Sequence, residues 1–297
     1  MKFQFIEAHT DEFTVVRMCE VLDVSKSGFY KWRKRQKKEA TERQNYRNEL
    51  KQVIVQVFHQ NFGVYGSPRI HEALLDLGYK VCERTVGRYM QELGLSATLP
   101  KKYKATTDSK HTLPVYDNLL NQDFETDEVN KVWVSDITYV WTPKGWLYLA
   151  AILDIYSRKV VGFEIDDNMR KEVPLNALNH AIRTRKPEEG LIHHSDRGSQ
   201  YASNDYVNAL EAIDANISMS RKGNPYDNAC CESFFATLKK EFIYRRDFQS
   251  KEEAIQGIAW YISFYNKKRK HSSNGYLSPE QFETKEMKPK APSTVVA

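Results

Sequence analysis

The spacing of apolar residues changes near residue 128, and this change constrains the fold more than any other feature of the sequence. Before it, apolar residues recur every three or four positions, which is typical of amphipathic helices. After it, residues 132–141 alternate and are rich in β-branched and aromatic side chains, which is typical of a β-strand. The pattern therefore predicts an all-α region followed by an α/β domain.

The order of elements in the second part predicts its topology. Three strand-like runs separated by short connections are most simply three antiparallel strands. A helix, a short strand, a helix, a brief strand and another helix follow. These elements are expected at 132–141, 146–154 and 159–165, after Pro174, at 191–196, 204–212 and 217–219, and from about Ala229. Such an order predicts a mixed sheet flanked by helices, with the first strand central and the fourth beside it.

The first 60 residues combine helical spacing with positive charge. Apolar residues at 15–22 and again from Phe29 flank a turn, where Ser25 or Ser27 can cap the second helix. Basic residues far outnumber acidic ones between 26 and 51, which indicates a polyanionic partner. An ordinary solvated helix face would show the same run of charges. The candidate DNA contacts in this run are Lys26, Lys31 and Arg33.

A clearer helix–turn–helix pattern lies at 61–100. Ser67 is expected to cap its first helix, and the second helix is expected to expose Arg84 and Arg88 on its early turns. Units of this kind place the start of the second helix in the major groove, where arginine can contact guanine. An ordinary helical hairpin would show the same spacing. Two tandem units beside a basic run favour DNA binding.

Composition excludes several other classes of protein. Hydrophobic residues make up 41% of the 297 residues, but no stretch approaches the roughly 20 apolar residues that a membrane-spanning helix requires. The opening residues carry acidic side chains where a secretion signal would be apolar, so we expect a cytoplasmic, nucleoid-associated protein without a membrane partner. The four cysteines lack the spaced pairs of a zinc site or a disulfide framework.

Three carboxylates, far apart in sequence, are the candidate chemical centre. Asp136 lies in the first strand, Asp196 ends the fourth, and Glu232 lies in the first turn of a helix. Clustered carboxylates repel one another, so a cation that neutralises them is expected, and oxygen ligands favour Mg²⁺, with Mn²⁺ as a substitute. Two such ions can activate the attacking and leaving oxygens of a phosphoryl transfer. Lys239 lies two helical turns after Glu232 and can hold a phosphate.

At these residues the sequence resembles the second-frame transposases of the bacterial insertion-sequence family numbered three, whose catalytic core is of the retroviral-integrase type. The resemblance is carried by VWVSDITYV, HHSDRGSQY, KGNPYDNACCESFFATLKKE and YNKKRKHSSNGYLSPEQF, and by FGVYGSPRIHEALLDLGYKVCERTVGRYMQELGL. Asp196 and Glu232 are separated by 35 residues, which matches the D-D-35-E signature of the family, and Lys239 matches its trailing base. Asn274-Gly275 departs from the family's usual Leu-Gly, and the zinc-domain histidines and cysteines of retroviral integrases are absent.

The resemblance implies an RNase H-like catalytic fold and a metal-dependent enzyme that cleaves 3′ ends and transfers strands at terminal inverted repeats. It also implies double-stranded element and target DNA as partners, and in some relatives fusion to an upstream-frame protein. Joining two ends requires at least a dimer. The loop before the catalytic helix is expected to contact the strand being joined, through Lys222, Asn224 and Tyr226.

Two other functions remain open from the residues alone. A nuclease of the same fold would need no recognition of terminal repeats, and a DNA-binding regulator would have lost the chemistry. The expected divisions of the chain are a basic helical region at 1–60, a helix–turn–helix unit at 61–100, a linker at 101–127, a catalytic core at 128–250, a helical extension at 251–283 and a disordered tail at 284–297.

Overall fold

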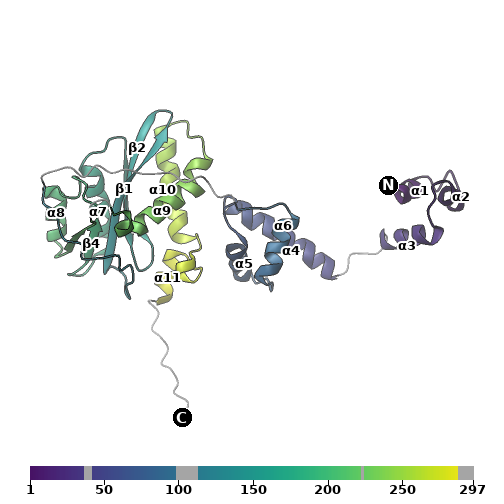
Figure 1. Ribbon diagram of the computed structural model, residues 1–297, viewed down its shortest axis with the longest axis horizontal. Helices are drawn as coiled ribbons and strands as arrows, with labels where there is room; N and C mark the ends of the chain where they lie inside the picture. The colour runs from purple at the N-terminus through teal and green to yellow at the C-terminus, as the bar shows by residue number, and fades with distance from the viewer. Residues whose placement is uncertain (37–41, 98–112, 222–223, 287–297) are drawn as a thin grey trace, which may run out of the picture.

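The computed structural model describes residues 1–36, 42–97, 113–221 and 224–286. Two helical units precede an α/β domain, as the change in apolar spacing predicts (Figure 1). None of the helices in these ranges combines the length and apolar character that crossing a bilayer demands.

The N-terminal unit contains α1 (Lys2–Ala8), α2 (Val15–Val21) and α3 (Lys26–Gln36). Its small core consists of the buried residues Ile6, Met18, Cys19 and Phe29. Of the two serines expected to cap α3, Ser25 does so, because its Oγ accepts a hydrogen bond of 2.9 Å from the Gly28 backbone N–H.

The second helical unit contains α4 (Glu42–Gln60), α5 (Ser67–Asp76) and α6 (Glu83–Glu92). Buried side chains from all three helices form one core, namely Leu50, Ile54, Val57, Phe58, Tyr65, Ile70, Leu74, Val86, Tyr89 and Met90. The boundary expected between residues 60 and 61 therefore separates α4 from the helices on which it packs. Apolar spacing identifies α4 as a helix but carries no information on which neighbours it buries its stripe against.

The expected cap of α5 is corrected by the structure. Gly66, not Ser67, is the N-cap residue, and Ser67 is already helical. The Ser67 hydroxyl instead donates to Glu83 Oε1 at the start of α6, at 3.5 Å. A serine before a proline fits either position from sequence alone, because Pro68 is accepted throughout the first helical turn.

The α/β domain is built on one five-stranded sheet in the order β3-β2-β1-β4-β5. The strands are β1 (Val132–Thr142), β2 (Gly145–Asp154), β3 (Val160–Asp166), β4 (Ile192–Ser195) and β5 (Asn216–Met219). The first three are antiparallel, while β4 runs parallel to both β1 and β5. The central position of β1 beside β4 confirms the predicted topology.

Helices cover both faces of this sheet (Figure 1). On one face, α7 (Glu172–Arg185) and α8 (Asn204–Glu211) form a core with β2 and the buried Trp133 of β1. On the other face, α9 (Ala229–Glu241) and α10 (Lys251–Lys267) pack on alternate residues of β1 and β2. The segment expected as a separate extension from residue 251 therefore begins with a helix of the catalytic domain's own core.

The helical unit 42–97 contacts the α/β domain through an aromatic cluster. Phe62, in the loop after α4, places its ring edge-on against Phe242, Trp260 and Phe264, with centroids 5.4–6.4 Å apart. The carbonyl of Phe62 also accepts a hydrogen bond of 3.0 Å from Arg245, in the 3₁₀ helix η2 (Ile243–Arg245).

A buried ion pair reinforces the same junction. Arg269 donates two hydrogen bonds of 2.7 Å to the carboxylate of Glu241, the last residue of α9. Tyr261 donates a third at 2.8 Å, and Arg69 of α5 lies 3.6 Å from the same carboxylate. Partly enclosed charges stabilise a structure only when their hydrogen bonds are satisfied, as they are here.

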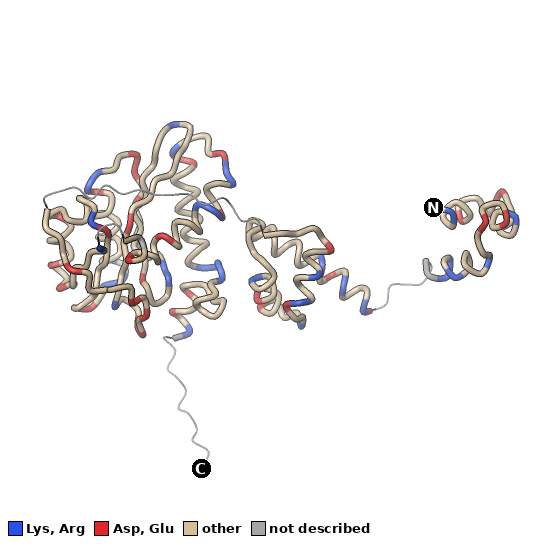
Figure 2. Tube along the Cα trace, in the orientation of Figure 1, with Lys and Arg blue, Asp and Glu red and all other residues tan. Residues whose placement is uncertain are grey.

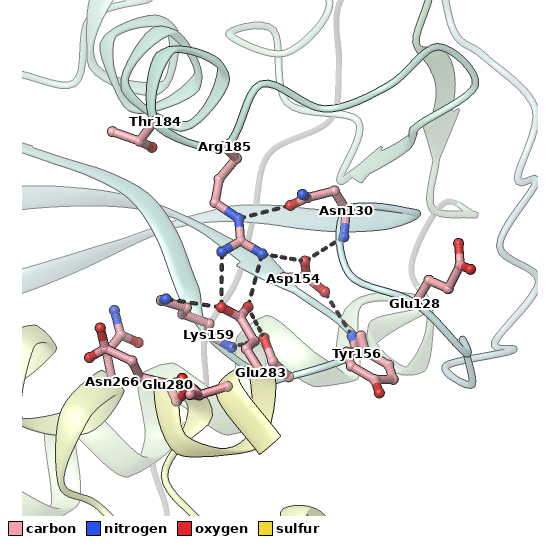
Figure 3. A network of polar contacts seen from close by, with 12 residues as sticks. Glu128, Asn130, Asp154, Tyr156, Lys159, Thr184, Arg185, Asn266, Glu280 and Glu283 are labelled. Carbon is pink, nitrogen blue, oxygen red and sulfur yellow. Dashed lines mark hydrogen bonds and ion pairs between the residues drawn. The ribbon is translucent and has the colours of Figure 1, made fainter. Parts of the chain in front are cut away.

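The last described elements are η3 (Ser272–Asn274) and α11 (Pro279–Glu286). Glu283 of α11 accepts two hydrogen bonds of 2.9 Å from Arg185, one of 3.0 Å from Lys159 and one of 2.8 Å from Ser157 (Figure 3). The helix continues to residue 286, so the tail expected from residue 284 starts too early. Residues 287–297 lie outside the described ranges.

Gly162 of β3 marks the closest approach of α7 to the sheet. A Cβ at this position would lie 2.3 Å from the Ala177 carbonyl oxygen and 2.9 Å from Ala181 Cβ. We expect Gly162→Ala to lower the free energy of unfolding by about 1–3 kcal/mol or more, because α7 must move away from β3. Urea denaturation followed by tryptophan fluorescence measures this change.

Gly87→Ala is the matched control for that variant. A Cβ at Gly87, inside α6, would meet only ordinary contacts with Ser67 at 3.6 Å or more. Alanine is the better helix former, so stability should stay equal or rise slightly. Equal stability of the Gly162→Ala variant and the native protein would contradict the close approach.

Candidate active site

The pairing of β4 with β1 brings Asp136 and Asp196 together. β4 is hydrogen-bonded to β1 only along Val132, Trp133 and Val134, so β1 continues past the end of β4 as an open edge. Asp136 lies on this edge, and Asp196 follows the last residue of β4 directly. The two half-buried aspartates are close enough for the charge of Asp196 to raise the pKa of Asp136.

Helix α9 adds the other two predicted groups. Glu232 lies in its first turn and is exposed, whereas Lys239 lies two turns later and is half-buried. The seven-residue interval places both on one face of the helix. Both also influence Asp136: the charge of Glu232 raises its pKa and that of Lys239 lowers it. The structure thus gathers Asp136, Asp196, Glu232 and Lys239 in one region.

Burial shifts the proton affinities of these groups. Burial is the largest cause of the raised pKa of Asp136, followed by the charge of Asp196. Burial also raises the pKa of Glu232, and it lowers the pKa of Lys239 against the opposing effect of Asp136. Burial and mutual repulsion thus disfavour the ionised form of these carboxylates, and a bound cation would favour it.

The donor set fits a hard divalent cation. It consists of carboxylate oxygens, which Mg²⁺ prefers, and its uncompensated charge favours a cation over a further anion. Within the ranges that the structure describes, no three acidic, histidine or cysteine side chains already stand close enough to enclose one ion.

A glycine fixes the carboxylate of Asp196. Its Oδ1 accepts a hydrogen bond of 2.8 Å from the Gly198 backbone N–H. A Cβ at Gly198 would lie 2.9 Å from that oxygen and 3.2 Å from Gln200 Oε1. Asp136 is held in a similar way, by the N–H of Ile137 at 2.8 Å.

The loop before α9 contains three residues expected to contact DNA. Asn224 caps the 3₁₀ helix η1 (Pro225–Asn228) by accepting a hydrogen bond of 3.1 Å from the Tyr226 N–H. Tyr226 is 72% exposed, so its ring is available to a ligand. Lys222 lies outside the described residues.

The sequence analysis missed Asp227, which holds this loop in place. Arg221 binds its fully buried carboxylate with Nε at 3.0 Å, Nη2 at 2.8 Å and the backbone N–H at 2.7 Å. Gln122 and Asn118, from the segment before β1, donate at 2.8 and 3.0 Å. These bonds, led by those of Arg221, hold the pKa of Asp227 well below its usual range.

Asn228 joins the start of α9 to β1. Its Nδ2 donates a hydrogen bond of 3.1 Å to the carbonyl of Ser135, the residue before Asp136. The consecutive Asp227 and Asn228 at a helix start are the sequence signal that could have revealed both roles, since these residue types favour helix N-termini.

The adjacent histidines are core residues. His193 pairs with the hydroxyl of Tyr206 at 3.1 Å, and His194 Nδ1 pairs with Ser218 Oγ at 2.8 Å. Burial lowers the pKa of His193 to about 3 and that of His194 to about 4. Both are therefore neutral near pH 7.

The helical units expose most of the predicted DNA contacts. Arg84 and Arg88 are exposed on α6, and Arg88 also lies 3.9 Å from Glu92. Basic residues lie along α3 in the N-terminal unit (Figure 2), and Lys26 and Lys31 of this helix are exposed.

Arg33 differs from these residues, because its Nε lies 3.0 Å from the Glu7 carboxylate. That contact must be broken or shared before Arg33 can bind a phosphate.

Known protein families match three parts of the chain. An HTH-like domain model matches residues 45–103, which include most of α4 and all of α5 and α6. Two integrase core domain models match residues 126–225 and 213–279, which together span the sheet, the three carboxylates and α10. Fold and site thus define an integrase-type recombinase of the DDE class, with a helix–turn–helix region before its catalytic core.

Similar proteins narrow this class to one family. Transposase InsF for insertion sequence IS3A of Escherichia coli K12 is 41% identical over 288 residues, covering 97% of this chain and 100% of InsF. The 31 kDa protein of insertion element IS600 from Shigella sonnei is 44% identical over 269 residues, covering 90% of this chain and 98% of that protein. The chain belongs to the IS3-family transposases. This assignment disfavours a plain nuclease and a DNA-binding regulator.

Solved structures that match this chain include viral integrases. The simian T-cell lymphotropic virus intasome matches with a TM-score of 0.47 and 16% identity, covering 64% of this chain and 65% of that chain. The HTLV-2 integrase catalytic core domain in complex with magnesium matches with a TM-score of 0.42 and 14% identity, covering 52% and 97%.

Asp227 gives a testable prediction about the site. Asp227→Asn removes the charge that Arg221 binds, so the loop before α9 should loosen and the carboxylates should lose alignment. We expect DNA cleavage to slow roughly ten- to a hundredfold, as small misplacements of catalytic groups do. Gel-based single-turnover cleavage measures the rate, and hydrogen exchange measures opening of the loop.

Asp205→Asn is the matched control, because Asp205 pairs with Lys171 at 2.7 Å on the surface. Exposed pairs contribute little to stability, so this variant should cleave at the native rate. If Asp227→Asn cleaved DNA at the native rate and its loop kept native protection from hydrogen exchange, the role of Asp227 in holding the loop would be contradicted.

Proposed function

We propose that this transposase cleaves the 3′ ends of its insertion sequence and transfers them to target DNA with two Mg²⁺ ions bound by Asp136, Asp196 and Glu232. The observation that carries the proposal is the gathering of acidic groups at the half-buried Asp136, whose pKa is raised by burial and by the charges of Asp196 and Glu232. A site with several carboxylates and too few basic side chains to neutralise them is suited to divalent cations. Mn²⁺ is expected to substitute for Mg²⁺.

Each residue has a distinct part in this reaction. Asp136 and Asp196 would hold both ions, and Glu232 would complete the ligands of one of them. When bound, the ions polarise the scissile phosphate and activate the attacking water or 3′-OH. Lys239, half-buried beside Asp136, holds a neighbouring phosphate of the strand being cut.

The loop before α9 positions the strand to be joined. Asn224 and Lys222 lie beside the start of the catalytic helix in sequence, and the 72% exposed Tyr226 offers an aromatic face. Asp227 and Asn228 hold the same segment against Arg221 and Ser135. A rigid base under exposed side chains is the arrangement that orients a substrate.

End recognition belongs to the helical units in this proposal. Arg84 and Arg88 contact base edges in the terminal repeats, while Lys26, Lys31 and Arg33 add salt-dependent contacts to phosphates. Two element ends must be held together for joining, so the active form is at least a homodimer. We further propose that the enzyme acts at the bacterial nucleoid and that an upstream-frame protein can be a partner or fusion.

The central test replaces Glu232 with glutamine. Glu232→Gln keeps the size of the side chain but removes its charge, so we expect end binding to persist while cleavage and strand transfer fall at least about a thousandfold. Gel shift measures binding, and a precleaved 3′-OH oligonucleotide with plasmid target measures joining. Glu211→Gln, an exposed glutamate at the end of α8, should retain full activity.

Chelation provides the second arm of this test. Removing divalent cations should stop cleavage by the native protein, and adding Mg²⁺ or Mn²⁺ should restore it. Strand transfer by Glu232→Gln at the native rate would remove the proposed role of this carboxylate in holding metal.

Replacing Arg84 tests end recognition. If Arg84 contacts a base edge, Arg84→Ala should weaken binding to the terminal repeat about tenfold or more and leave binding to unrelated DNA almost unchanged. Fluorescence anisotropy at several salt concentrations separates this case from a phosphate contact, whose loss weakens both DNAs and lowers the salt dependence. Arg183→Ala is the control, because Arg183 is an exposed arginine on α7. It should leave the affinities for the terminal repeat and for unrelated DNA unchanged.

A further inference from the structure

The hairpin between β1 and β2 carries an exposed aromatic cluster. Trp141 and Trp146 face each other across the hairpin and are 58% and 42% exposed. Their ring centroids are 4.8 Å apart, and the half-buried ring of Tyr139 lies 5.2 Å from that of Trp146. Large aromatic side chains gathered in the open are unusual on a folded surface and mark a site of interaction.

The exposure follows from how the neighbouring strands end. β4 pairs with β1 only as far as Val134, and β3 pairs with β2 only from Tyr148 onward. The end of the hairpin therefore projects past both of its neighbours in the sheet (Figure 1). Core packing does not require tryptophan at positions 141 and 146.

Lys239 connects the cluster to the carboxylates. Asp136 and Tyr139 point to opposite faces of β1, but this part of β1 is an open edge. Lys239 lies beside that ring, because its Nζ is 5.1 Å from the centre of the Tyr139 ring, and it follows Glu232 on the same helix, two turns later. A nucleic acid strand whose phosphate is bound by Lys239 would thus continue onto the aromatic cluster.

The distances suit a nucleic acid strand. Tyr139 and Trp141 are three and five residues beyond Asp136, or roughly 10 and 17 Å along an extended strand. That length corresponds to about three to five nucleotides of a stacked strand, at about 3.4 Å each. Aromatic rings beside a basic side chain suit a strand with unpaired nucleobases. The rings stack on the nucleobases, and the lysine binds a phosphate.

We propose that Tyr139, Trp141 and Trp146 form a stacking platform for unpaired bases of the DNA strand next to the reacting phosphate. The inference rests on the proposed function, because it places the phosphate at Asp136 and Lys239. A protein partner is a poorer fit: two half-exposed indoles offer roughly 200 Å², far below the roughly 800 Å² per partner of a stable interface.

The first experiment measures stacking directly and does not require cleavage. The probe is a duplex of the terminal inverted repeat that borders the gene together with its flanking DNA, and it carries 2-aminopurine at the three nucleotides next to the outer end of the repeat. With Ca²⁺ replacing Mg²⁺, binding by the native protein should quench the fluorescence of at least one of these bases. Trp141→Ala and Trp146→Ala should lose the quenching and bind about tenfold more weakly, while Trp141→Phe should retain both.

An abasic nucleotide gives the decisive comparison. Removing the base that stacks should weaken native binding to the level of Trp141→Ala, and it should change the binding of Trp141→Ala itself very little. If the abasic nucleotide and Trp141→Ala each weakened binding and their effects added together, the proposed stacking platform would be overturned. Met169→Ala, at a 50% exposed apolar residue after β3, should bind and quench as the native protein does.

The remaining outcomes separate this inference from the proposed function. Native quenching and native affinity in folded Trp141→Ala would overturn the platform, even while Glu232→Gln stays inactive and the proposed function stands. Failure of the native protein to cleave in Mg²⁺ would overturn the proposed function, whereas the quenching in Ca²⁺ would still report on the platform. A loss of self-association by light scattering, with unchanged quenching, would make the cluster an interface between copies and overturn the inference.

Discussion

The short parallel pairing of β4 with β1 is the constraint on which the rest of the structure depends. It joins the strands along three residues of β1 and then stops, which leaves Asp136 on an open edge with Asp196 beside it. A longer pairing would cover Asp136 with backbone, and a register shift of one residue would turn it to the other face. Because this pairing stops early, β1 is also open where Lys239 lies beside the aromatic residues of the hairpin.

Helix α9 links this edge to the helical unit that precedes the domain. Its first turn carries Glu232, while its last residue, Glu241, binds Arg269 and lies near Arg69 of α5. Asp227 and Asn228 fix the start of the same helix against the segment before β1 and against β1 itself. These contacts connect α5 to the helix that carries a proposed metal ligand.

The site also shows where folding and function conflict. Burying carboxylates near one another costs free energy, and the raised pKa of Asp136 reflects that cost. Asp227 is buried more completely, yet its pKa is lowered, because Arg221, Gln122 and Asn118 donate to it. The difference between the two aspartates separates a group that the fold has satisfied from one that is left for a ligand.

The sequence by itself determined the local elements and the residues that carry charge into the site. Alternation located β1, β2 and β3, and helical spacing located α5, α6 and α9, because both periodicities arise within one segment. Tertiary structure alone decided that α4 packs with α5 and α6, that Gly66 rather than Ser67 caps α5, and that Asp227 holds the catalytic loop. It also decided that Trp141 and Trp146 stay exposed. Each of these depends on what a distant segment does or fails to cover, and the pattern of one segment carries no information about that.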